Sequence, residues 1–99
     1  MGLTQNRGTS SLGSIGSTKV LNVGATTVAY TIDSGMVAIE VTNVGDSAIW
    51  YGDSTLVSNS GGFLAVHSSK YWDNVVDNFT IYFVCPAASA IAIHEYKGR

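Results

Sequence analysis

Cysteine and proline are almost absent from this chain: each occurs once among 99 residues. With Cys85 as the only cysteine, no disulfide can form within the chain, so packing and hydrogen bonds must hold the fold. Cys85 ends an apolar run and precedes Pro86, a position typical of a buried thiol and not of a nucleophile. No apolar run approaches the roughly 20 residues that a membrane-spanning helix needs. We therefore expect no membrane partner.

Charged residues are also scarce, at 12% of the chain, where soluble proteins average about 25%. The formal net charge is −2, and the five Lys and Arg residues are scattered, so no basic stripe is present to neutralise phosphates. We therefore expect no nucleic-acid partner. A surface rich in Ser, Thr, Asn, Gly and Ala costs little to desolvate, which favours burial against other subunits.

The residue types of catalytic and metal sites are present but lack the spacing that such sites need. The two histidines, His67 and His94, show no spacing that brings either of them to Cys85. No Gly-x-Ser-x-Gly elbow supports a serine nucleophile, and no Asp-x-Asp-x-Asp-Gly run supports a calcium loop. We expect no enzymatic activity and no catalytic residue, metal or cofactor, and we interpret the aspartates as turn residues.

Residues 1–17 consist mainly of Gly, Ser and Thr, with apolar side chains only at Leu3, Leu12 and Ile15 after the initial Met. Such a segment buries too little apolar surface to offset the backbone entropy of ordering, about 1–2 kcal/mol per residue. We expect an extended N-terminal arm that neighbouring subunits hold in place, with its apolar residues as interface candidates. The β-domain is expected over residues 18–99.

Alternation of apolar and polar residues predicts β-structure in the remainder of the chain. The expected strands are 18–23, 27–33, 36–44, 47–52, 62–66, 69–73, 78–85 and 89–96. Asp33-Ser34-Gly35 and Val44-Gly45-Asp46 predict short hairpin turns, in which glycine supplies a positive φ. Eight short strands predict two sheets packed face to face, a β-sandwich of jelly-roll or immunoglobulin-like type. The pattern leaves the strand order open.

The same alternation predicts the core, because successive residues of a strand point to opposite faces. The residues expected to be largely buried are Ile39, Val41, Phe79, Ile81, Phe83 and Ile93. His94 and Tyr96 are expected on the face opposite Ile93.

Two pairs of adjacent aromatic residues are the strongest candidates for a binding surface: Trp50 with Tyr51, and Tyr71 with Trp72. Only one member of each pair can face the core, so the other faces outward. Exposed Trp and Tyr residues anchor protein interfaces, and on β-sandwiches they also stack against sugars. An intersubunit contact and a sugar platform both remain open.

The segment 39–66 resembles small β-domains of tailed-phage virion proteins. The resemblance rests on Thr42-Asn43-Val44-Gly45, on Ile49 to Ser54, and on Ser60 to Leu64. The chain departs from the pattern after Leu64, where Ala65-Val66-His67 replaces the usual x-Pro-Gly.

This resemblance implies a non-enzymatic virion component, such as a capsid decoration (cement) protein or a head-fibre domain. It implies a homo-oligomer located on the virion, with a major capsid protein or another virion structural protein as partner. The alternative that it leaves open is a carbohydrate- or receptor-binding module of a phage fibre or tail.

Overall fold

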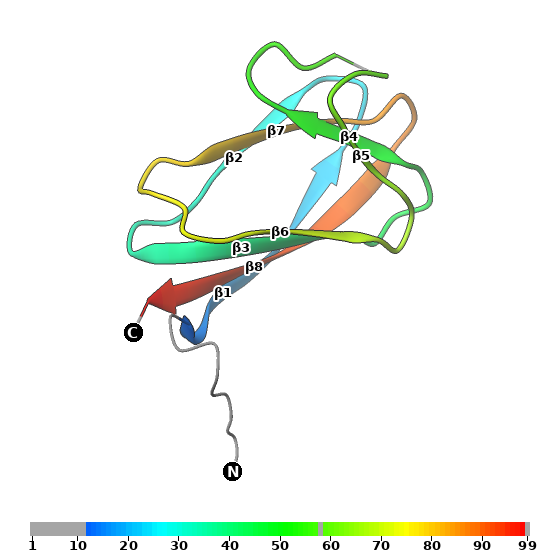
Figure 1. The fold of residues 1–99 in the computed structure, drawn as a ribbon. Coiled ribbons are helices and arrows are strands. Elements are labelled where there is room, and N and C mark those ends of the chain that lie inside the picture. The colour runs from blue at the N-terminus through cyan, green and yellow to red at the C-terminus, as the bar shows by residue number, and fades with distance from the viewer. Residues whose placement is uncertain (1–11, 58, 99) are drawn as a thin grey trace.

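The computed structural model describes residues 12–57 and 59–98. Within these ranges the chain forms eight β-strands in two four-stranded antiparallel sheets, which confirms the expected β-sandwich (Figure 1). The strands are β1 (Leu12–Val23), β2 (Val28–Thr31), β3 (Met36–Asn43), β4 (Ile49–Gly52), β5 (Gly62–Leu64), β6 (Ser69–Trp72), β7 (Thr80–Val84) and β8 (Ser89–Gly98). Across the described ranges, no helix is long and apolar enough to cross a membrane.

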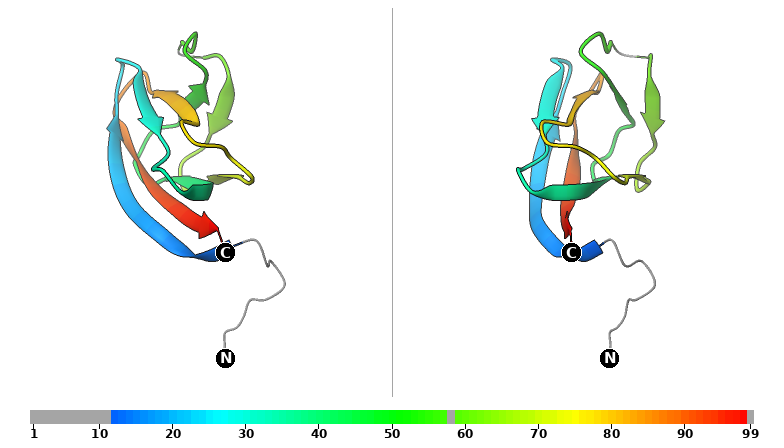
Figure 2. Two further views of the ribbon diagram at one scale, coloured as in Figure 1. Left: turned by 90° about the vertical axis from the view of Figure 1, so that its left-hand side faces the viewer. Right: turned by 60° about the vertical axis from the view of Figure 1, so that its left-hand side comes forward.

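The strand order identifies the sandwich as a jelly roll. One sheet has the order β1-β8-β3-β6 and the other β2-β7-β4-β5. Four antiparallel pairs, β1 with β8, β2 with β7, β3 with β6 and β4 with β5, make the chain one long hairpin whose tip is β4–β5. This hairpin is rolled so that its successive pairs fall alternately in the two sheets (Figure 2). Such an arrangement of eight strands in two sheets is the jelly-roll form of the β-sandwich.

The prediction that residues 33–35 and 44–46 form hairpin turns is wrong. Each of them carries the chain from one sheet to the other, because β2 and β4 lie in one sheet and β3 lies in the other. Gly35 does have a positive φ of 86°, as expected. Gly45 does not, and glycine is needed there because a Cβ would lie 2.6 Å from the backbone nitrogen of Ala90. Turn residues encode a reversal of the chain but not which strands pair.

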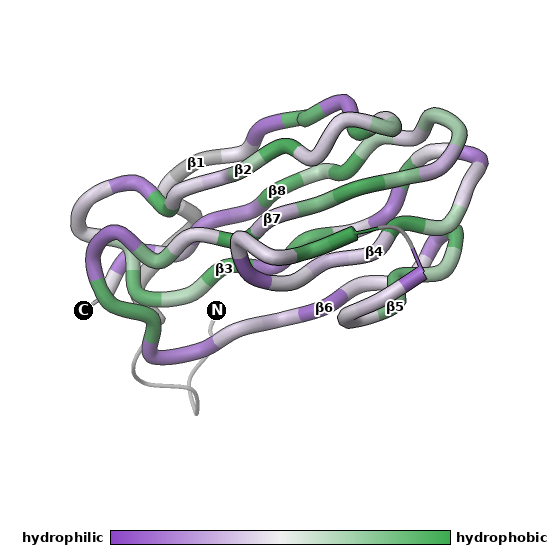
Figure 3. The backbone as a smooth tube through the Cα atoms, turned by 90° about the horizontal axis from the view of Figure 1, so that it is seen from above, coloured by the Kyte–Doolittle hydropathy of each residue, from purple (hydrophilic) through white to green (hydrophobic). Residues whose placement is uncertain are grey.

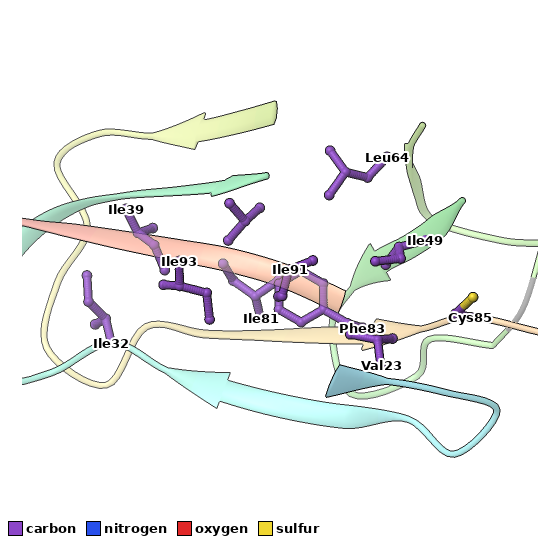
Figure 4. Packing of buried hydrophobic residues seen from close by; sticks show 11 residues of the cluster. Val23, Ile32, Ile39, Ile49, Leu64, Ile81, Phe83, Cys85, Ile91 and Ile93 are labelled. Carbon is purple, nitrogen blue, oxygen red and sulfur yellow. The ribbon is translucent and has the colours of Figure 1, made fainter. Parts of the chain in front are cut away.

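The core lies between the sheets and confirms most of the expected inward positions (Figure 4). The fully or almost fully buried members of the predicted set are Ile39, Val41, Ile81, Phe83 and Ile93. Phe79, which precedes β7, is only half-buried and packs at the margin of the core. Cys85 is buried, as expected. Hydrophobic colour recurs along β7, β8 and β3 (Figure 3). In these strands buried residues alternate with partly buried ones along much of their length.

Strand β1 begins at Leu12, earlier than the start expected at residue 18. The backbone of Leu12 pairs with Gly98 and that of Ile15 with Tyr96, with irregular register on either side of Ile15. Because β8 continues to Gly98, its backbone can pair with the residues that precede 18. The Gly- and Ser-rich sequence of those residues does not predict this pairing. Leu3, the remaining apolar residue of the expected arm, lies outside the described residues.

A polar network joins the two sheets at the side formed by β1 and β2. Glu95 of β8 is fully buried, and its Oε2 accepts hydrogen bonds from the Tyr30 hydroxyl at 2.6 Å and from the Asp33 backbone N–H at 3.0 Å. Lys19 of β1 donates to the Tyr30 hydroxyl at 3.0 Å and forms an ion pair with Asp33 at 2.9 Å. Residues from β1, β2 and β8 are thereby connected across the gap between the sheets.

The network raises the pKa of two of its members, Tyr30 and Lys19. Burial, followed by the hydrogen bond to Glu95, raises the pKa of the Tyr30 hydroxyl to about 12. The hydrogen bonds with Asp33 and then with Tyr30 raise the pKa of Lys19. The hydroxyl of Tyr30 holds its proton more tightly in the folded state than in the unfolded state. Its contribution to the free energy of unfolding is therefore complete below pH 10 and is lost as the pH rises through 12.

We therefore expect the free energy of unfolding to fall between pH 10 and pH 12, and to fall less in Tyr30→Phe than in the wild type. Urea unfolding at a series of pH values from 8 to 12 measures the two profiles. The difference between the profiles reports the titration of Tyr30 together with the part of the Lys19 shift that Tyr30 causes. Parallel profiles across this range would contradict the role assigned to Tyr30.

Candidate functional site

Among the residues that the structure describes, none of the outward-facing strand positions of the β2-β7-β4-β5 sheet is charged. The core residues of this sheet point inward, so the alternate positions point outward. The outward residues are Ala29, Thr31, Trp50, Gly52, Phe63, Thr80, Tyr82 and Val84. We call this surface the uncharged face. It can be buried against another surface without desolvating any charge.

An aromatic pair stands at the β4–β5 end of the uncharged face. Trp50 and Phe63 are register partners, with ring centroids 4.9 Å apart and an edge-to-face angle of 61°. Phe63 is 56% exposed, whereas Val84, the partner of Trp50 on the other side, is only 2% exposed. A hollow of about 310 Å³ adjoins Trp50 and is bordered by Pro86 and other loop residues. An aromatic pair with an exposed ring on an uncharged sheet face is typical of an interaction surface.

The structure settles which member of each predicted aromatic pair faces outward. Trp50 faces outward and Tyr51 packs against the core; Tyr71 is 42% exposed and Trp72 packs against the core. Because β4 and β6 belong to different sheets, Trp50 and Tyr71 lie on opposite outer faces of the sandwich. The four predicted residues therefore form no single platform.

The two inward residues of these pairs meet between the sheets. Tyr51 and Trp72 pack edge to face, with centroids 5.4 Å apart at 89°, and Trp72 contacts Phe79 at 6.2 Å. Gly62 makes this possible, because a Cβ there would overlap the Tyr51 ring. Lys70 lies over the Trp72 ring, with its Nζ 5.9 Å from the centroid. The cluster joins the two sheets on the side opposite the Glu95 network.

A hollow of about 260 Å³ opens beside this cluster. It is lined by the three aromatic residues of the cluster together with Gly52, Asp53, Thr80 and Ile81. The Asp53 Oδ1 accepts hydrogen bonds from the Thr55 hydroxyl at 2.6 Å and from the Thr55 backbone N–H at 2.9 Å. These bonds, the side-chain one first, lower the pKa of Asp53. Asp53, whose carboxylate is held by Thr55, thus adjoins the hollow beside the aromatic rings.

The other outer face, on the β1-β8-β3-β6 sheet, is more polar. Glu40 lies in register between His94 and Tyr71 near its middle. Tyr71 also packs edge to face with Tyr96, at 6.2 Å. His94 faces outward as expected and is half-buried; its Nδ1 is buried and has no hydrogen-bond partner within the part of the chain that the structure describes. Burial, followed by the charge of Asp73, raises the pKa of the Tyr71 hydroxyl.

Sequence reasoning missed Phe63 and Tyr82 as site residues. Both lie in predicted strands, but their place beside Trp50 and Gly52 depends on the strand order. The alternation of apolar and polar residues predicts that Phe63 and Leu64 point to opposite faces of the sheet. It does not predict that Phe63 lies beside Trp50. Among residues 12–57 and 59–98, no three His, Cys, Asp or Glu side chains converge in a way that could hold a metal ion.

No protein-family model, curated protein or solved structure matches the chain. The function is therefore inferred from the surfaces described above.

We expect Gly62→Ala to displace the Tyr51 ring and to lower the free energy of unfolding by about 1–3 kcal/mol, as overpacking does. Gly24→Ala is the matched control, because a Cβ there meets only the Ala87 carbonyl oxygen, at 4.0 Å, and should change stability by less than about 0.5 kcal/mol. Urea unfolding monitored by tryptophan fluorescence measures both variants. Equal stabilities of the two variants would show that the Tyr51 ring does not depend on Gly62.

Proposed function

We propose that this protein is a non-enzymatic virion structural protein, which decorates or cements a capsid lattice by burying its uncharged face against neighbouring subunits. The proposal rests on the pair formed by the half-buried Trp50 and the exposed Phe63, within a sheet face whose described outward strand residues carry no charge. Burial of apolar surface contributes about 25 cal/mol per Å². Because no charge loses its hydration on this face, the desolvation of charged groups does not offset that gain.

The fold and the sequence resemblance support the same class of function. Jelly rolls form viral capsid domains, although they also form lectin and cupin domains, so the fold alone is an analogy. The segment 39–66, which resembles tailed-phage virion domains, runs from β3 through β4 and β5. It therefore includes the hairpin that carries Trp50 and Phe63. The partners in this proposal are other copies of the chain and a major capsid protein.

In this proposal the residues that precede β1 act as an arm. Eleven extended residues reach about 36 Å, enough to cross onto an adjacent subunit. Their backbone groups would add to the free edge of a neighbour's sheet, where main-chain hydrogen bonds give affinity with little demand on side chains. Repetition of modest contacts over a lattice then provides avidity.

We expect the tagged full-length chain to co-purify with particles when it is produced during phage propagation in the native host. Phe63→Lys should reduce this incorporation at least about tenfold, because it places a charge in the contact. Val20→Lys is the matched control, since Val20 is 69% exposed and lies on the other outer face, and it should incorporate normally. Absence of the wild-type chain from gradient-purified particles would refute the virion assignment.

A second candidate function is carbohydrate or receptor binding at the hollow beside Tyr51, Trp72 and Phe79. The aromatic residues and Asp53 that line this hollow favour it, because sugars offer both apolar faces and hydroxyl groups.

Titration with bacterial-surface oligosaccharides, followed by amide chemical shifts, tests this candidate. If it holds, shifts will concentrate at the hollow, disappear in Asp53→Asn and persist in Phe63→Lys. If no resonance moves at about 10 mM sugar, well above a 1 mM dissociation constant, the candidate is excluded.

A further inference from the structure

We propose that a site on the polar outer face, formed by β3, β6 and β8, binds the guanidinium of Arg7 from a second copy of this chain. The site consists of Glu40, Tyr71 and Tyr96, and we call it the tyrosine site. It lies on the β1-β8-β3-β6 sheet (Figure 1). This inference rests on the proposed function, in which the residues that precede β1 act as an arm, and it names where a neighbouring copy receives that arm.

Two tyrosine rings form the apolar part of the tyrosine site. The rings of Tyr71 on β6 and Tyr96 on β8 pack edge to face, with centroids 6.2 Å apart. Because β3 lies between β6 and β8, the two rings meet over β3. Ala38 of β3, the register partner of Tyr96, is fully buried although it alternates with the inward Ile39. This burial agrees with rings that cover β3, and Tyr71 remains 42% exposed for contact.

Glu40 adds a negative charge beside the two rings. It is the register partner of Tyr71 and lies two residues from Ala38 on the same face of β3. Burial is the largest cause of the raised pKa of both tyrosine hydroxyls, and the charge of Glu40 is a further cause for each. Across residues 12–57 and 59–98 the only ion pair joins Lys19 to Asp33, so no cation is paired with Glu40. A cation at this position would therefore gain both a carboxylate and two aromatic rings.

The guanidinium of arginine matches this combination of groups. It is planar, it stacks on aromatic rings, and its N–H groups donate paired hydrogen bonds to a carboxylate. The ammonium of lysine is more strongly hydrated and acts as a point charge. The tyrosine site therefore favours an arginine side chain.

The chain contains two arginines, Arg7 and Arg99. Arg99 directly follows Gly98, the last residue of β8, so its backbone cannot leave its own sandwich by more than one residue. Arg7 precedes Leu12 by five residues, which span about 17 Å when extended. It is also the only charged side chain among residues 1–11. Arg7 is therefore the arginine that can reach a neighbouring copy.

The direction of β1 favours a contact between copies over one within a copy. Leu12 pairs with Gly98, and Glu40 lies level with the β8 residue four positions before Gly98, about 14 Å along the strand. A reversal of the chain through residues 8–11 would return Arg7 only to the level of Leu12. Its side chain would then stop short of Glu40. An extended arm instead carries Arg7 away from its own sandwich and towards a neighbour.

The edge of the sheet beside the tyrosine site can hold the arm. β6, which carries Tyr71, is an edge strand of the sheet. An arm that adds to the free side of β6 would lie about 4.8 Å from it, held by main-chain hydrogen bonds. An arginine in register with Tyr71 would then extend over the Tyr71 ring towards Glu40, which lies on the next strand.

A peptide of residues 1–11, titrated into the isotope-labelled full-length chain and followed by amide chemical shifts, tests the tyrosine site. We expect the shifts to concentrate at Glu40, Tyr71 and Tyr96. Glu40→Gln should weaken binding about two- to fivefold, the range of an exposed ion pair. Asp46→Asn is the matched control, because it removes one exposed carboxylate from the loop between β3 and β4 and should bind like the wild type.

An exchange of the two charges tests the pairing itself. The Arg7→Glu peptide should fail to bind the wild-type chain and should bind the Glu40→Arg chain. A dispersed amide spectrum confirms that each variant is folded, and Glu40→Gln remains a test if Glu40→Arg does not fold. Equal binding of the native and Arg7→Glu peptides to the wild type, shifts located away from the tyrosine site, or an equal loss in Asp46→Asn would overturn the proposal.

A last comparison separates contact between copies from contact within a copy. The wild type and the full-length Arg7→Gln variant are compared at about 50 µM, where a millimolar contact between copies is scarcely populated. Their amide shifts should agree at the tyrosine site. Different shifts there would place Arg7 on its own copy and overturn the contact between copies. A chain that does not bind the peptide but co-purifies with particles would overturn this site and leave the virion assignment intact.

Discussion

The structure depends on one buried carboxylate that holds two sheets together. Glu95, on β8, has no exposed surface. Its Oε2 accepts hydrogen bonds from the hydroxyl of Tyr30, on β2 of the other sheet, and from the backbone N–H of Asp33, which follows β2. A buried carboxylate without such partners would cost several kcal/mol, so Tyr30 and Asp33 can occupy few other positions. The network therefore fixes β2 against β8 and, through Lys19, against the edge strand β1.

This constraint leaves the other side of the sandwich to a different kind of contact. There the sheets are joined by the Tyr51, Trp72 and Phe79 rings, with a hollow beside them. The rolled hairpin also places its tip, β4–β5, at the edge of a sheet, where Trp50 and Phe63 stand outside the core. The polar side of the molecule thus stabilises the fold, while the aromatic side and the β4–β5 hairpin present the surfaces available to partners.

The sequence predicts the strands, the two layers and most inward positions, because the alternation of side chains between the two faces of a strand is a local property that is visible within each strand. It does not predict the strand order, since the turn at Gly45 encodes a reversal and not a pairing. The Trp50–Phe63 pair and the opposite placement of Trp50 and Tyr71 depend on that order. Glu95 shares the parity of Ile93, yet its burial is explained only by Tyr30, which lies far away in the sequence.

A double-mutant cycle between Tyr30→Phe and Glu95→Met tests most directly whether this bond holds the sheets together. The methionine is similar in length to glutamate and removes the acceptor, while the phenylalanine removes the donor. Urea unfolding of the wild type, the two single variants and the double variant gives their interaction energy. We expect a favourable coupling of about 1–3 kcal/mol, in the range found for buried hydrogen-bonded neighbours. A coupling below about 0.3 kcal/mol, the level of additivity for independent sites, would contradict the account.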